Sequence, residues 1–72
     1  MAYDYAKLNG KIVEICGTRK AFGEKMGFSE ATTSKKLKGE IPFRQHEISK
    51  SIEILGLSTD DIPEYFFTEK LS

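Results

Sequence analysis

Glycines at regular intervals divide this chain into short segments. Between them, apolar residues recur every three or four positions, which is the spacing of one face of an α-helix. The glycines that stand where helices would end are Gly17, Gly27, Gly39 and Gly56. No stretch alternates apolar and polar residues for long, and no Asn-Gly or Asp-Gly hairpin turn is present. The pattern predicts an all-α fold, a single compact bundle of about five short helices.

The length predicts one domain, spanning residues 1–72, because domains usually take roughly 100–200 residues. Hydrophobic residues at 39% and charged residues at 31% are typical of a folded globular chain and exclude a disordered one. No apolar run approaches the ~20 residues of a membrane helix, and no signal-peptide core is visible. We therefore expect a cytoplasmic protein without a membrane partner.

A single cysteine, Cys16, and a single histidine, His46, limit the chemistry of the chain. One cysteine cannot form an intrachain disulfide, and one of each residue supplies no metal-binding cluster. The motifs of nucleophilic hydrolases, phosphate-binding loops and zinc proteases are missing from the sequence. We expect no enzyme, no metal and no cofactor.

The first predicted helix begins after Asp4, which is placed to cap its start. Its buried stripe is expected to comprise Tyr5, Leu8, Ile12, Ile15 and Cys16. The fourth helix is expected to start near Gln45, with Glu47 at its third position. Its buried stripe is expected to comprise Ile48, Ser51, Ile52 and Leu55.

Residues of about 18–38 carry the pattern of a helix-turn-helix. Gly23 supplies the small residue where two helices pack closely, and Gly27 tolerates the positive φ of the turn. A glycine inside a helix costs about 1 kcal/mol relative to alanine, and close packing would offset that cost at Gly23. Gly10 carries the same cost inside the first helix, and no compensation is evident there.

The formal net charge of zero conceals two segments of opposite sign. Residues 18–39 hold six basic and two acidic side chains, a net charge of +4. Residues 58–72 hold one basic and four acidic side chains, a net charge of −3. Such an asymmetry indicates interaction surfaces, and the basic one favours nucleic acid.

The third helix is the expected reader of DNA, because a recognition helix enters the major groove with its N-terminal part. With Thr33 and Leu37 inward, a step of 100° per residue places Ala31, Lys35 and Lys38 on the opposite side. The candidate base contacts are Ser29, Glu30, Ala31, Thr32, Ser34 and Lys35. The candidate phosphate contacts are Arg19, Lys20, Lys36, Lys38 and Arg44. The alternative is that these lysines only solvate an exposed face.

The acidic end surrounds three adjacent aromatic residues, which cannot all face one short core. Its carboxylates are Asp60, Asp61, Glu64 and Glu69. Either Tyr65 and Phe66 close the bundle while Phe67 lies on the surface, or the segment contacts a partner. The candidate partner-binding residues are Asp60, Asp61, Glu64, Tyr65 and Phe67. A partner is expected, because one recognition helix reads only a few base pairs.

Four runs of the sequence resemble the small Cro-like phage regulators: residues 11–17, 36–39, 54–57 and 62–67. Over nearly all of the chain, the sequence is most similar to the modulator-of-repression (antirepressor) proteins of temperate lactococcal phages. This resemblance implies a lambda-repressor-like DNA-binding domain that acts in the bacterial host cell, in a lysis–lysogeny switch. It implies a hetero-complex with the phage repressor, and operator DNA bound weakly or jointly with it. An autonomous Cro-like homodimeric repressor is the alternative, and an antitoxin of a toxin pair is a third.

Overall fold

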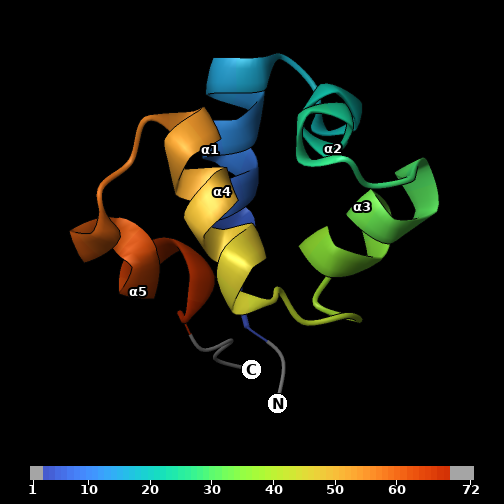
Figure 1. Cartoon of the computed structure of the whole chain (residues 1–72). Coiled ribbons are helices and arrows are strands. Elements are labelled where there is room, and N and C mark those ends of the chain that lie inside the picture. Colours follow the sequence, from blue (N-terminus) through green and yellow to red (C-terminus); the bar gives the residue numbers. More distant parts are fainter. Residues whose placement is uncertain (1–2, 69–72) are drawn as a thin grey trace.

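Five α-helices and one 3-10 turn make up the computed structural model, which describes residues 3–68 (Figure 1). The helices are α1 (Ala6–Cys16), α2 (Arg19–Met26), α3 (Glu30–Leu37), α4 (Gln45–Leu55) and α5 (Ile62–Phe66). The 3-10 turn η1 (Thr59–Asp61) leads directly into α5. No strand is present within the described residues, so the all-α prediction is confirmed there. Glu69 lies outside them.

The helix ends follow the glycines, as predicted. Gly17, Gly27, Gly39 and Gly56 all have positive φ. Gly27, with φ of 83°, is in the left-handed conformation that ends α2 and starts the turn to α3. At the start of α1, the Asp4 carboxylate accepts a hydrogen bond of 2.9 Å from the Ala6 N–H, although α1 formally begins after Tyr5. The Thr18 hydroxyl accepts one of 3.0 Å from the Ala21 N–H at the start of α2.

One hydrophobic core joins all five helices. Its fully buried members are Leu8, Ile12, Phe22, Leu55 and Phe66, with Tyr5, Met26, Leu37, Ile48 and Ile52 around them. The prediction that Ile15 belongs to the buried stripe of α1 is wrong, since 44% of Ile15 is exposed. Ile15 lies at the edge of the stripe in the last turn, where Cys16 takes the inward position and packs against the core.

The helices form a central pair with one group of elements on either side. In Figure 1, α1 and α4 lie in the middle, α2 and α3 lie on one side, and η1 with α5 lies on the other. The Asp4 N–H donates a 2.7 Å hydrogen bond to the Thr68 carbonyl, so the first and last described segments are joined. Within residues 3–68, every helix falls short of the length and apolarity that crossing a membrane requires.

Candidate functional site

The first candidate site is the unit formed by α2, a three-residue turn and α3. Gly23 faces Thr33 so closely that a Cβ atom at position 23 would overlap the Thr33 hydroxyl and lie 3.0 Å from its Cβ and Cγ2. The expected close packing at Gly23 is therefore present. At Gly10, by contrast, an added Cβ meets nothing within 4 Å. The glycine within α2 is thus required by packing, and the one within α1 is not.

The outward face of α3 carries most of the predicted base-contact residues. Glu30, Ala31, Ser34 and Lys35 are exposed, and Lys38 follows the helix on the same open side. Thr32 is half-buried. These side chains project away from the core and are free to contact a partner.

Two hydroxyls at the start of α3 already have partners. The Ser29 hydroxyl accepts a 3.2 Å hydrogen bond from the Thr32 N–H and donates one of 3.0 Å to the Thr32 hydroxyl. Thr33 is buried, and its hydroxyl donates a 2.9 Å hydrogen bond to the Ser29 carbonyl. The Ser29 side chain therefore caps the start of α3, and the Thr32 hydroxyl is occupied by its hydrogen bond with Ser29.

A hollow of about 240 Å³ separates the start of α2 from α3. Its lining combines the inward-facing Thr33 with predicted phosphate and base contacts, namely Arg19, Lys20, Glu30, Ser34 and Lys38. The sequence separates these residues by up to 19 positions, and the turn after α2 brings them to one surface. The hollow carries three cationic side chains and one carboxylate, so its net charge favours an anionic partner.

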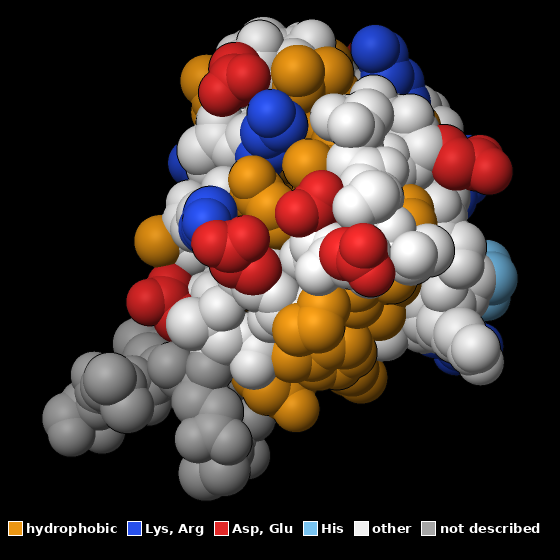
Figure 2. Space-filling model, turned by 90° about the vertical axis from the view of Figure 1, so that its left-hand side faces the viewer, with side chains coloured by type: hydrophobic (Ala, Val, Ile, Leu, Met, Phe, Trp, Pro, Cys, Tyr) orange, Lys and Arg blue, Asp and Glu red, His pale blue; other side chains and the backbone are white. Residues whose placement is uncertain are grey.

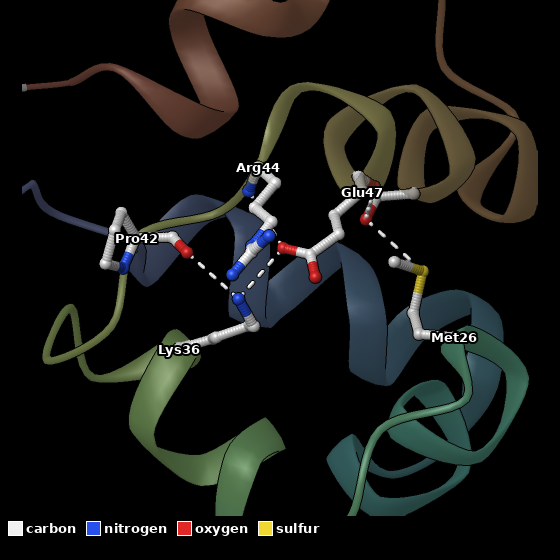
Figure 3. A network of polar contacts seen from close by, with 6 residues as sticks. Met26, Lys36, Pro42, Arg44 and Glu47 are labelled. Atoms are coloured by element: carbon white, nitrogen blue, oxygen red, sulfur yellow. Dashed lines mark hydrogen bonds and ion pairs between the residues drawn. The ribbon is translucent and has the colours of Figure 1, made fainter.

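The prediction that Lys36 contacts phosphate is corrected by the structure. Lys36 is only 4% exposed, and its ammonium donates hydrogen bonds of 2.8 Å to Glu47 Oε1 and 2.9 Å to the Pro42 carbonyl (Figure 3). Its Nζ also lies 5.3 Å from the ring centre of Phe28 and 5.7 Å from that of Phe43. Thr33, Lys36 and Leu37 share the inward face of α3, so Lys36 ties α3 to the α3–α4 connection and to α4.

Glu47 is the other member of this buried ion pair. Its carboxylate also accepts a 2.8 Å hydrogen bond from the Arg44 N–H, which holds the start of α4. Burial raises the pKa of the Glu47 carboxyl, but the hydrogen bonds from Arg44 and Lys36 outweigh it, so the pKa falls below the ordinary value. The Glu47 carboxylate is therefore charged at neutral pH. Arg44 itself is exposed at the start of α4, beside the end of α3.

The second candidate site is the acidic end of the chain. Asp60 and Glu64 are exposed, while Asp61 is half-buried and accepts a 3.0 Å hydrogen bond from the Ser58 N–H. Glu64 pairs with Lys7 of α1, and this hydrogen bond raises the pKa of the Lys7 ammonium. Both side chains of the pair are more than half exposed, so the pair contributes little to stability.

The aromatic residues of the acidic end divide between core and surface. Phe66 is buried, Tyr65 is half-buried, and 47% of Phe67 is exposed. Phe66 and Tyr65 thus close the bundle, and Phe67 lies on the surface, where a partner would also have to contact it. Figure 2, which shows the face that carries α5, has several acidic side chains above a large hydrophobic patch. Sequence reasoning missed Tyr3, whose ring lies 5.5 Å from that of Phe67 at an interplanar angle of 85°.

The similarity to known proteins covers the whole domain. The chain belongs to the family described as "Protein of unknown function (DUF739)", whose model matches residues 1–69. It is similar to a protein solved in solution, the modulator of repression (MOR) of the temperate bacteriophage TP901-1 from Lactococcus lactis. The two share 46% identity over 100% of this chain and 97% of that chain, with a TM-score of 0.83. The resemblance to modulator-of-repression proteins is thus confirmed. Among curated proteins, no match is found.

Proposed function

We propose that this chain is a phage-type transcriptional regulator that modulates a repressor in a lysis–lysogeny switch. The observation that carries the proposal is the match to a modulator of repression over the full length of both chains. The partner would be the phage repressor, bound in a hetero-complex, and operator DNA would be bound weakly or jointly with it. The repressor and its operator DNA meet inside the infected cell. The protein would therefore work in the cytoplasm of the bacterial host.

The unit of α2 and α3 would be a helix-turn-helix of the lambda-repressor-like kind. The close approach of the two helices at Gly23 and Thr33 supports this, as does the exposed face that carries Ser34 and Lys35. Arg19 and Lys20 stand in the first turn of α2, which has no acidic residue. Cations there oppose the helix dipole, and a bound phosphate would relieve that cost.

Direct DNA binding should be weak, because fewer of the predicted phosphate-contact side chains are exposed than the sequence alone indicated. With Lys36 buried, the phosphate-contact residues that remain are Arg19, Lys20, Lys38 and Arg44. Four phosphate contacts correspond to a slope of roughly −3.6 for the logarithm of the binding constant against the logarithm of salt concentration. Lys35 and Ser34 would address base edges, and Glu30 would be repelled by phosphate unless it accepts from a cytosine amino group.

Mixing the purified chain with the repressor of the same phage tests the main proposal. Gel filtration should show one complex of defined stoichiometry that replaces both free proteins. The same mixture should shift operator DNA differently from either protein alone in an electrophoretic assay. Two separate elution peaks, with DNA binding by the repressor unchanged, would contradict the proposal.

A second candidate function is that of an autonomous Cro-like homodimeric repressor. The observation that favours it is the set of exposed, DNA-compatible side chains on α3. In that case, the chain alone should bind its operator, and replacing Lys35 with alanine should cost about 1–3 kcal/mol and relax sequence preference. Sedimentation of the chain as a monomer, with no operator shift at low salt, would exclude this function.

A further inference from the structure

One carboxylate, that of Glu30, lines the hollow between α2 and α3 together with three cationic side chains. Arg19 and Lys20 belong to the first turn of α2, and Lys38 directly follows α3. All four side chains belong to exposed residues. Within residues 3–68, the ion pairs are formed by other carboxylates, so the charge of Glu30 is not neutralised by a direct partner there. The surface that attracts anions thus carries a negative charge of its own.

The register of α3 fixes the position of Glu30. Glu30, Ser34 and Lys38 are spaced four residues apart, so they lie along one face of the helix. Thr33 borders this face and packs against Gly23, which turns the face toward α2. All three residues of the face line the hollow. An anion that enters the hollow therefore meets Glu30 as well as the cations.

The other groups of the hollow do not offset this carboxylate. The Thr33 hydroxyl already donates a 2.9 Å hydrogen bond to the Ser29 carbonyl, and Ser34 supplies one neutral hydroxyl. Lys36, the further cation that the sequence offered, is buried in its ion pair on the inward side of α3. Three cations and one carboxylate leave the lining with a net charge of +2, which would become +3 without the charge of Glu30.

We propose that Glu30 is a specificity-determining residue that acts by repulsion and keeps DNA phosphate out of the hollow. A phosphate held by Arg19 and Lys20 would lie beside a like charge, and juxtaposed like charges suppress binding. The unmodified chain would then not occupy operators by itself, and operator DNA would be bound jointly with the repressor. The inference rests on the proposed function, in which α3 faces DNA. It assigns Glu30 to the phosphate backbone and not to a cytosine base.

Replacing Glu30 with glutamine tests this role directly, because glutamine keeps the size of the side chain and removes its charge. The probes are two duplexes of equal length, the operator of the same phage and a scrambled sequence. Fluorescence anisotropy measures their binding to the purified chain between about 50 and 200 mM salt. Glu30→Gln should bind both duplexes roughly tenfold more tightly at the lower salt concentration. The salt slope should steepen by about 0.9, the contribution of one further phosphate contact.

Two matched variants separate the position of the charge from its presence. Glu24→Gln removes an exposed carboxylate of α2 that does not line the hollow, so it changes the net charge equally. It should change the affinity for DNA by less than about twofold. Glu30→Asp keeps a carboxylate at the hollow and should leave the affinity near that of the unmodified chain. Glu30 is also the acidic residue in the first turn of α3, so thermal unfolding of each variant measures its separate effect on stability.

Three results would overturn the role of Glu30 in repelling DNA. The first is equal binding by Glu30→Gln and Glu24→Gln, which would reduce the effect to net charge. The second is weaker binding of the operator alone by Glu30→Gln, which would show that Glu30 contacts a base. The third is a lower melting temperature of Glu30→Gln with unchanged DNA binding, which would leave Glu30 a structural role.

The assay with DNA contains no repressor, so its outcome is independent of the test of the proposed function. If the unmodified chain forms no complex with the repressor, the proposed function is wrong, whatever the affinities for DNA. If that complex forms and Glu30→Gln gains no affinity for DNA, the role of Glu30 is refuted and the proposed function stands.

Discussion

Replacing the buried Lys36 with methionine should strongly destabilise the domain. Methionine keeps the apolar stem but removes the ammonium, which bonds Glu47 Oε1 at 2.8 Å and the Pro42 carbonyl at 2.9 Å. The Glu47 charge would then remain buried with one hydrogen bond, from the Arg44 N–H. Removing one partner of a buried ion pair typically costs about 3–5 kcal/mol. Because the side chains of Lys36 and Glu47 are 5% and 11% exposed, we expect a value of about 3 kcal/mol.

A loss of that size is large for a chain of 72 residues. Such a domain has about 4–11 kcal/mol of stability in total, and its melting temperature shifts about 4–8 °C per kcal/mol. Lys36→Met should therefore lower the melting temperature by roughly 12–24 °C. Urea unfolding followed by circular dichroism gives the free energy directly, and calorimetry gives the melting temperature.

A double-mutant cycle shows whether the pair itself is responsible. Glu47→Gln keeps an acceptor for the Arg44 N–H and removes the charge. Combined with Lys36→Met, it should recover at least half of the loss, because no unpaired charge is left in the interior. Lys35→Met is the control, since Lys35 is the exposed neighbour on α3 and should change stability by less than about 0.5 kcal/mol. Equal effects of Lys35→Met and Lys36→Met, or strict additivity in the cycle, would refute the reasoning.

Three further predictions follow from contacts described above. Gly10→Ala should raise the free energy of unfolding by about 0.5–1 kcal/mol, since its added Cβ meets nothing within 4 Å. A lower free energy of unfolding in urea denaturation would contradict this. Gly23→Ala should lower it by about 1–3 kcal/mol, because the new methyl overlaps Thr33, and Thr33→Ala in the same background should return part of the loss. The folded-state pKa of Glu47 is lowered, so its stabilising effect is present above the ordinary carboxyl pKa and is lost as pH falls through the folded value. Urea titrations from pH 7 downward should show less acid sensitivity in Glu47→Gln than in the unmodified chain, with Glu53→Gln, on the exposed side of α4, as the control.

Much of the fold could be predicted because its signals are local. Helix ends depend on glycines and capping side chains that act within four residues, and the structure follows them at Gly27 and Thr18. Ile15 shows the limit of periodicity, since the stripe of α1 does not reveal how far the neighbouring helices cover its last turn.

The candidate sites were less predictable because they depend on residues that are distant in the sequence. Lys36 stands three residues after the inward-facing Thr33, which is the spacing of residues on one helix face, so a signal for its burial was present. Its partner Glu47, however, is 11 residues away, and only the tertiary structure shows that the two meet. The contact between Tyr3 and Phe67 joins the first and last segments of the described residues, and no pattern in either segment points to the other.

The hydrogen bond between Asp4 and Thr68 has a practical consequence for how the protein is handled. It brings both ends of the described chain to the place where the exposed rings of Tyr3 and Phe67 pack edge to face. A purification tag fused before residue 1 or after residue 72 would begin only a few residues from these two rings. A pull-down through such a tag would miss any complex that involves these two rings. Binding experiments should therefore use a chain from which the tag has been removed.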